Sequence, residues 1–530
     1  MKLIAFKHNI FQSIFLILIL NSCQQTKPLA NSDSFPLSEI TISKIQQGYK
    51  NKEYTVKKIV TLYLDRIQEI DDAGPELNSI LMINPDAIKI ADSLDKLIKT
   101  GENNSPLFGI PIVLKDNINT ADKMPTTGGS RILKNSFPRK DSWVAKKIRD
   151  AGGVIIAKAN LSEWANYRAS FSSSGWSGLG GQTKNPYVLD RNPCGSSSGS
   201  AVAVSSNLCA VSVGTETWGS IICPSNANGI VGIKPTVGLW SRSGILPISY
   251  TQDTAGPMAR TVRDAATFLG ALTGIDKKDK KSIRSKGNYF KDYTQFLKTS
   301  GLNGKRIGYL KTEGGKHFRV DTLMNRAVNY IKSQGAEIIN LDKIVEGTPY
   351  QNSIEVLAYE FKDGIKKYFE DLGDVAAFSN LEEIIEATSQ DSIEMHFFDL
   401  YRMKNANSKP SIETSDYKVF LQNMLKAYQK NGIDKVMDEY KLDAIVAPSG
   451  APAWKTDKIN GDGGISVSTS VYAALSGYPN ISVPMGFIDD VPVGISFFGK
   501  EWSEPILIEI AFAYEQGTLH RSPPKFLVTD

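Results

Sequence analysis

Apolar positions along the chain fall into segments with helical spacing and segments with strand-like runs, and the two kinds alternate. Residues 142–151 carry apolar side chains at helical spacing, and after two glycines the apolar run 154–157 predicts a strand. Further segments with these patterns are the helices 199–208, 320–334, 356–371 and 503–516, and the strands 210–213, 336–339, 443–447 and 480–484. Strands that alternate with helices predict an α/β fold whose sheet is covered by helices on both faces.

The first residues have the pattern of an export signal. Lys2 and Lys7 precede the apolar run 14–20, which is too short to span a membrane stably. We therefore expect residues 1–22 to be a signal peptide and the protein to be exported. From residue 38 to residue 530 no linker interrupts the alternation, so we expect one large domain there.

The signal ends in Leu20-Asn21-Ser22-Cys23, which resembles the bacterial lipoprotein box. On this interpretation Cys23 becomes a lipidated N-terminus, and its acyl chains hold the protein on a bacterial membrane, facing the periplasm or the cell surface. Residues 23–37 are polar with two prolines and would serve as a tether. The alternative is an ordinary cysteine behind a cleaved signal.

Composition excludes several functional classes. Of 530 residues, 41% are hydrophobic and 22% charged, and the net charge of +5 is too close to neutral to predict a nucleic-acid partner. The four histidines are isolated, and no Cys/His cluster is present, so we expect no metal site. If Cys23 is lipidated, the remaining cysteines, Cys194, Cys209 and Cys223, allow at most one disulfide.

Residues 170–225 are unusually rich in glycine and serine. Because these residues lie between apolar helices and strands, a packed functional loop cluster is favoured over a flexible linker. A dinucleotide site is disfavoured, since Thr183 occupies the third glycine position after Gly178-x-Gly180. Residues 195–199 formally match the G-x-S-x-G nucleophile elbow, but a turn rather than a strand precedes them.

Lys115 ends the apolar strand 108–114. A lysine can act as a base only when it is neutral, which requires burial or cationic neighbours to lower its pKa. A serine nucleophile served by this lysine is one interpretation of the residue. On the sequence pattern alone, a salt-bridged lysine at a strand end is the more frequent case.

A series of segments resolves this choice, because it resembles the amidase-signature enzymes in order over nearly the whole length. The segments are GIPIVLKDN (109–117), GGQTKNPY (180–187), CGSSSGSAVAV (194–204), GTETWGSIICPS (214–225), GIVGIKPTVG (229–238), DTAGPMARTVRDA (253–265), SGYPNISVPMGF (476–487), VPVGISFFGKEWSEP (491–505) and YEQGTLHRSPP (514–524). The resemblance implies a single large domain with a central mixed, twisted sheet. It also implies amide hydrolysis by a Ser–cis-Ser–Lys triad without a cofactor.

Carried over by position, the resemblance gives each triad residue a role. Lys115 would be the base, Ser196 the bridging serine on a cis peptide, and Ser220 the nucleophile. Ser197 is expected to support Lys115 through a hydrogen bond. The backbone N–H groups of the oxyanion hole would come from Thr217, Trp218 and Gly219.

The resemblance is strongest to bacterial peptide amidases, so the expected substrates are peptide amides or other small amides. Ser170 and Phe171, beside the glycine-rich loops, are predicted pocket residues. Two alternatives stay open at this point: an esterase that uses the same acyl chemistry, and a non-catalytic lipoprotein that binds amides or peptides. The oligomeric state is not determined by the sequence.

Overall fold

The computed structural model describes residues 35–100, 105–311, 316–347, 349–463 and 467–529. The predicted signal peptide 1–22, the predicted lipidation site Cys23 and most of the tether 23–37 lie outside these residues. Across the described ranges, no helix is both long and apolar enough to cross a membrane.

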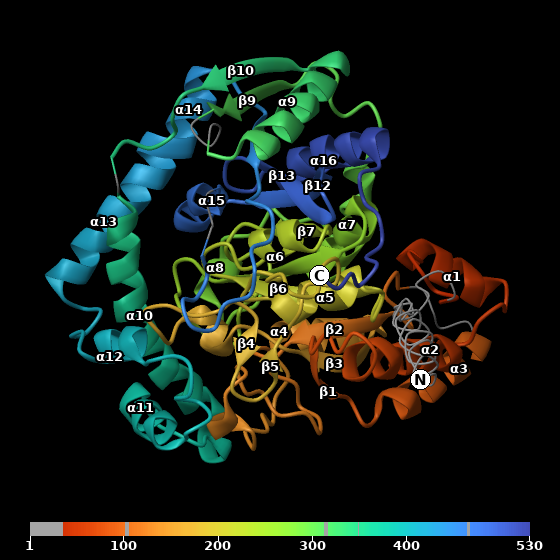
Figure 1. The fold of residues 1–530 in the computed structure, drawn as a ribbon, viewed down its shortest axis with the longest axis vertical. Coiled ribbons are helices and arrows are strands. Elements are labelled where there is room, and N and C mark those ends of the chain that lie inside the picture. Colours follow the sequence, from red (N-terminus) through yellow and green to blue (C-terminus); the bar gives the residue numbers. More distant parts are fainter. Residues whose placement is uncertain (1–34, 101–104, 312–315, 348, 464–466, 530) are drawn as a thin grey trace, which may run out of the picture.

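Eleven of the strands formed by the described residues make one mixed sheet, in the order β1-β3-β2-β6-β8-β7-β12-β13-β11-β9-β10 (Figure 1). Their bounds are β1 Ile80–Ile83, β2 Pro111–Lys115, β3 Val154–Ala159, β6 Val211–Glu216, β7 Val231–Lys234, β8 Thr254–Ala259, β9 Arg306–Leu310, β10 Glu337–Leu341, β11 Ala444–Pro448, β12 Asn480–Ile488 and β13 Val491–Phe498. β2 runs parallel to both β3 and β6, whereas the centre of the sheet, from β6 to β13, pairs antiparallel. The short strands β4 (Trp176–Ser177) and β5 (Gly181–Gln182) pair separately.

Helices pack against both faces of this sheet, as predicted (Figure 1). The helices formed by the described residues are α1 Ile42–Lys50, α2 Val56–Ile67, α3 Ala87–Thr100, α4 Trp143–Asp150, α5 Ser198–Ser205, α6 Ile222–Ala227, α7 Val262–Ala271, α8 Lys280–Ile283, α9 Phe318–Ser333, α10 Tyr350–Leu372, α11 Leu381–Gln390, α12 Tyr401–Asn407, α13 Ser415–Tyr428, α14 Asp434–Glu439, α15 Ser470–Ser476 and α16 Glu504–Thr518. The prediction of one large α/β domain is confirmed.

Local sequence signals explain where the predicted elements begin and end. Helix α4 begins after Ser142, whose Oγ accepts the N–H of Ala145 at 3.1 Å and so caps the first turn. The helix is followed by Gly152, whose φ of +73° suits glycine and reverses the chain into β3. The predicted helix at 142–151 and strand at 154–157 therefore match α4 and β3 closely.

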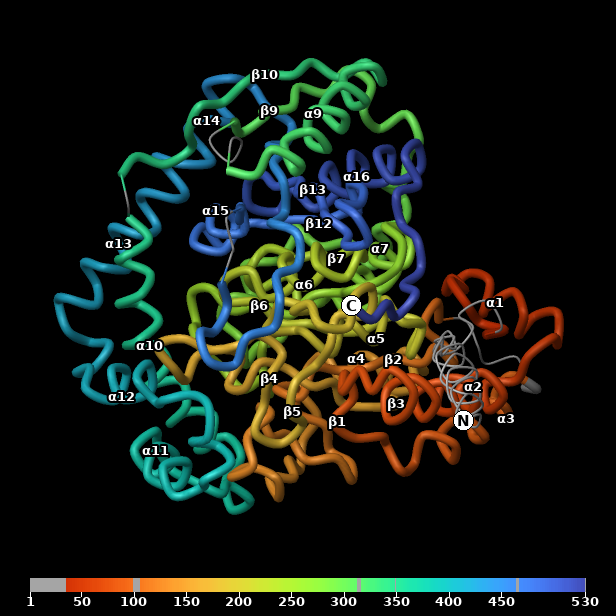
Figure 2. The backbone as a smooth tube through the Cα atoms, viewed as in Figure 1, coloured from red at the N-terminus to blue at the C-terminus, as the bar shows by residue number. Residues whose placement is uncertain are grey.

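Helices α10 to α13 form a layer on one side of the sheet, left of it in Figure 2. A buried carboxylate fastens this layer to the loop before β8. Glu360 of α10 accepts the Thr251 Oγ1 hydroxyl at 2.6 Å and the Tyr417 hydroxyl of α13 at 2.6 Å. This contact places α10 beside the loop that leads to the candidate site.

Candidate active site

Lys115 lies at the end of β2, in a strand whose residues are all buried. Its Nζ donates to Ser196 Oγ at 2.8 Å, to Thr215 Oγ1 at 2.9 Å and to the Thr215 carbonyl at 3.1 Å. Burial lowers the pKa of Lys115 to about 7, although the charges of Asp253 and Glu216 act in the opposite direction. Near pH 7 a large fraction of this amine is therefore neutral and able to accept a proton.

Ser196 lies fully buried between the strand that carries Lys115 and the start of α5. The peptide bond between Gly195 and Ser196 is cis, as the resemblance implies. The Ser196 carbonyl accepts the N–H of Ser162 at 3.1 Å. These contacts fix the serine hydroxyl beside the lysine amine.

Ser197 supports the lysine indirectly rather than through the direct hydrogen bond that we expected. Its Oγ donates to the Thr215 carbonyl at 2.9 Å and accepts the Thr215 N–H at 3.1 Å. Thr215 in turn holds Lys115 through its carbonyl and its hydroxyl. The N–H of Ser197 donates to the Ser220 carbonyl at 3.2 Å, which brings the two serine segments together.

Ser220 follows β6 in a tight loop that leads into α6. Its side chain is 8% exposed, so the hydroxyl lies at the edge of the buried cluster. The preceding Gly219 has a φ of +82°, and a Cβ atom there would lie 2.7 Å from Ser470 Oγ. The backbone conformation therefore favours glycine at this turn, and a larger residue would also have to displace the Ser470 hydroxyl. The Glu216 carboxylate caps the far side of the turn by accepting the Ile221 N–H at 2.8 Å.

Thr217 is held by two consecutive residues that sequence reasoning did not single out. Gln252 Nε2 donates to the Thr217 carbonyl at 3.2 Å, and Thr217 Oγ1 donates to Asp253 Oδ1 at 2.5 Å. Asp253 is partly buried, and its removal from solvent raises its pKa to about 6. In the sequence, Asp253 is notable only as the first residue of the segment DTAGPM, one of the segments that carry the family resemblance, and has no role of its own assigned to it.

Trp218 is partly buried where helix α10 approaches the loop. Its ring centroid lies 6.5 Å from that of Tyr350, at the start of α10. The side chain packs against two apolar clusters. One is formed by α10, α11, α12 and neighbouring loops, and the other by α10, α13 and α15. Trp218 therefore links the loop 217–220 to the helical layer.

A cavity of about 820 Å³ lies beside this cluster. Its walls include Asn117, Thr215 and Thr217, together with parts of the loop 242–254 and of α10. Asn117 Nδ2 donates to Thr215 Oγ1 at 3.0 Å, so the wall is continuous with the partners of Lys115. The cavity therefore borders the lysine site.

The two predicted pocket residues are exposed and lie outside the walls of this cavity. Ser170 Oγ donates to Asp399 Oδ2 at 2.8 Å, and the ring of Phe171 packs edge-on against Phe398 at 6.1 Å. Both contacts are with the segment before α12. Within the described residues, no group of three or more His, Cys, Asp or Glu side chains is placed to hold a metal ion.

Comparison with known proteins identifies relatives over nearly the whole chain. The family model described as "Amidase" matches residues 58–508. A protein of Arabidopsis thaliana named "Probable amidase" is 39% identical over 99% of this chain and 100% of its own length. A glutamyl-tRNA(Gln) amidotransferase subunit of Microcystis aeruginosa is 34% identical over 92% of this chain and 99% of its own length.

Solved structures give the same result. A peptide amidase in complex with the competitive inhibitor chymostatin superposes with a TM-score of 0.90, at 42% identity over 92% of this chain and all of that chain. The native peptide amidase of Stenotrophomonas maltophilia gives a TM-score of 0.89 at 41% identity, over 92% of this chain and 99% of that chain. The protein is therefore an enzyme that belongs to the amidase family.

Proposed function

We propose that the enzyme hydrolyses peptide C-terminal amides and related small amides to an acid and ammonia, through an acyl intermediate on Ser220. The observation that carries this proposal is the contact of 2.8 Å between the buried Lys115 Nζ and Ser196 Oγ. The amine has hydroxyl and carbonyl partners there rather than a carboxylate, and its pKa is about 7. It can therefore act as a base at neutral pH.

In the proposed reaction, Ser220 Oγ attacks the amide carbonyl carbon while its proton passes to Ser196 Oγ, and the Ser196 proton passes to neutral Lys115. Backbone N–H groups of Thr217, Trp218 and Gly219 would stabilise the negative oxygen, where one such donor is typically worth about 3–4 kcal/mol of barrier. Ser196 then protonates the departing ammonia and regains its proton from Lys115. Water releases the acid by the same route.

Two observations support peptide amides as the substrate class. The similarity to the two peptide amidase structures extends over 92% of the chain at 41–42% identity. The cavity of about 820 Å³ beside Thr215 and Thr217 lies within the range of roughly 300–1,000 Å³ that is usual for ligand pockets. A short peptide or a small organic amide fits this size.

Ammonia release from peptide amides, aliphatic amides and aryl amides tests the proposal, with matched esters in the same panel. We expect the parent enzyme to release ammonia and Ser220→Ala to release none. Ser206→Ala is the matched control, because Ser206 is a buried serine just beyond the other end of α5. Equal rates in the parent and Ser220→Ala would exclude Ser220 as the nucleophile, and faster turnover of every ester would indicate an esterase.

We also propose that the enzyme is exported and anchored at Cys23. The support is the leader sequence, together with the disulfide between Cys194 and Cys223, since disulfides persist mainly in oxidising compartments. Labelling of cells with a radioactive fatty acid tests the anchor. We expect the parent protein to be labelled and to sediment with membranes, and Cys23→Ser to be unlabelled and soluble. An unlabelled parent would refute the anchor.

A further inference from the structure

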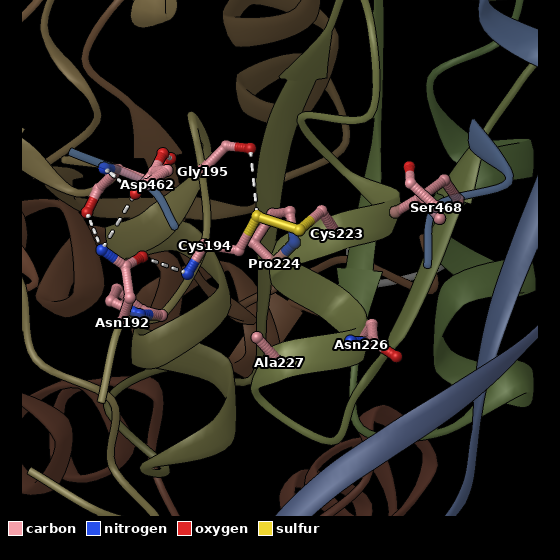
Figure 3. Close-up of a disulfide and its surroundings, with 12 residues drawn as sticks. Asn192, Cys194, Gly195, Cys223, Pro224, Asn226, Ala227, Asp462 and Ser468 are labelled. Atoms are coloured by element: carbon pink, nitrogen blue, oxygen red, sulfur yellow. Dashed lines mark hydrogen bonds between the residues drawn. A yellow bond between two sulfur atoms is a disulfide. The ribbon is translucent and has the colours of Figure 1, made fainter. Parts of the chain in front are cut away.

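The Cys194–Cys223 disulfide joins the two segments that carry the serines of the candidate triad (Figure 3). Cys194 lies two residues before Ser196, and Cys223 lies three residues after Ser220. The two cysteines are 29 residues apart in sequence, and their Cα atoms are 5.9 Å apart. The covalent bond therefore limits how far one serine segment can move from the other.

A hydrogen bond makes a second link on the other side of Ser196. The N–H of Ser197 donates to the Ser220 carbonyl at 3.2 Å. Cys223 is in turn fixed to the turn before Ser220, because its N–H donates to the Gly219 carbonyl at 2.8 Å. Ser196 is thus linked to the Ser220 loop from both directions along the chain, by a hydrogen bond on one side and by the disulfide on the other.

The backbone at Cys194 shows that a side chain is accommodated here at some conformational cost. Its φ of +56° lies in the left-handed region, which glycine adopts far more readily than other residues. Two hydrogen bonds hold this conformation: Asn192 Oδ1 accepts the Cys194 N–H at 2.8 Å, and the Cys194 carbonyl accepts Ser198 Oγ at 2.6 Å. A glycine at 194 would keep the favoured backbone and remove the disulfide alone.

The surroundings of the disulfide make it accessible to a reductant from one side. Cys194 is 5% exposed, whereas Cys223 is only partly buried. Both pack against an apolar cluster that includes Ala227, Ala453 and Trp454. Because this cluster would also cover two thiols, the contribution specific to the disulfide is the fixed distance between the serine segments rather than the burial of sulfur.

We propose that the Cys194–Cys223 disulfide positions the two serines for the reaction. It holds Ser196 and Ser220 at the separation that proton transfer between them requires. This inference rests on the proposed roles of the two serines. Reduction by a dithiol such as dithiothreitol transfers two electrons and two protons to the disulfide. It yields the Cys194 and Cys223 thiols, while the reagent closes its own disulfide. In the reduced enzyme, the segments that flank the two serines keep only non-covalent links. These include the hydrogen bond from the Ser197 N–H to the Ser220 carbonyl, and those from Asn228 Nδ2 to the carbonyls of Pro193 (2.8 Å) and Pro224 (2.7 Å).

The test measures kcat and KM of the folded enzyme before reduction, after reduction and after reoxidation. Displacements of about 1 Å in an active site can cost as much as 100-fold, so we expect kcat to fall by about 10-fold or more. We expect KM to change by less than about twofold, because the cavity walls at Thr215 and Thr217 are not part of the link. Reoxidation should restore kcat.

Two variants separate positioning from stability. Cys194→Gly and the double variant Cys194→Ser/Cys223→Ser should both show the lowered kcat at a temperature where circular dichroism shows them folded. The double variant should also be insensitive to dithiothreitol. Full kcat in folded, reduced enzyme or in folded Cys194→Gly, with only the melting temperature lowered, would overturn the proposal.

A second readout does not depend on the substrate. A fluorophosphonate probe labels an activated serine, and we expect it to label Ser220 in the oxidised enzyme about 10-fold faster or more than in the reduced enzyme. If no amide is turned over but this difference is seen, the assigned substrate class fails and the positioning role stands. Equal labelling rates in both forms would overturn the positioning role.

Discussion

Two buried lysines on neighbouring strands show what makes one of them suitable as a base. Lys115 ends β2 and Lys158 lies in β3, and neither side chain has exposed surface. Lys158 Nζ donates to the Ile118 carbonyl at 2.7 Å and lies 3.6 Å from Asp116 Oδ1. Lys115 contacts only hydroxyl and carbonyl oxygens among its hydrogen-bond partners.

The difference lies in the counter-charge rather than in burial. Burial lowers the pKa of both amines, and the adjacent Asp116 carboxylate partly reverses this effect for Lys158. The charges that act on Lys115, those of Asp253 and Glu216, make no direct contact with its amine. Lys158 is thus held as half of a buried ion pair, and Lys115 is left to exchange a proton near neutral pH.

The substitution Lys115→Met should have the largest effect on activity. Loss of a general base typically costs 10²–10⁴-fold, so we expect ammonia release to fall by at least about 10³-fold. The free energy of unfolding should change by no more than about 1 kcal/mol, because both Thr215 groups that contact Lys115 keep another hydrogen-bond partner. The Thr215 carbonyl still accepts from Ser197 Oγ, and Thr215 Oγ1 still accepts from Asn117 Nδ2. Initial rates and urea unfolding check the two halves of this prediction.

The substitution Lys158→Met should show the opposite pattern. It leaves the Asp116 carboxylate buried without its cation, and breaking a buried pair in this way typically costs about 3–5 kcal/mol of unfolding free energy. Urea unfolding measures the loss. The control is Asp116→Asn/Lys158→Met, which should recover part of it. A Lys158→Met enzyme as stable as the parent would show that the two lysines do not differ in the way proposed.

The sequence alone could predict the place of Lys115 but not its partners. Asp116 is its neighbour in the chain, which suggests an ion pair at the strand end. Successive side chains of a strand point to opposite faces, however, and Asp116 pairs with Lys158 of the next strand instead. The salt-bridged lysine that we weighed as an alternative for Lys115 is therefore found at Lys158 instead. Distinguishing the two lysines required the register of β2 and β3.

Other parts of the site were also beyond sequence reasoning. The cysteine count allowed one disulfide among three residues, and only the fold brings Cys194 and Cys223 together while Cys209 stays buried and unpaired by a disulfide. Gln252 lies 35 residues from Thr217, and its place directly before the segment DTAGPM does not indicate which residue its side chain contacts. By contrast, the alternation of strands and helices was visible because each element has its own local hydrophobic period.

The pH profile sharpens the comparison by reporting the state of Lys115. Its pKa is lowered to about 7, so the amine is charged and inactive as a base below this pH and neutral above it. We expect kcat/KM to rise with pH, to reach half of its maximum near pH 7 and to level off above this point. A profile that is flat from pH 6 to pH 9 would argue against a lysine base with this pKa.

The smallest expected effect on the pH profile comes from Asp253, whose negative charge raises the pKa of Lys115. Removing this charge in Asp253→Asn should favour the neutral amine and move the midpoint of the profile to lower pH by roughly half a unit. Asp374→Asn is the matched control, since Asp374 is also in the cavity wall but is exposed and paired with Arg139. An equal shift in both variants would reflect the overall charge of the cavity. A shift in Asp253→Asn alone would show that this one partly buried carboxylate raises the pKa of Lys115.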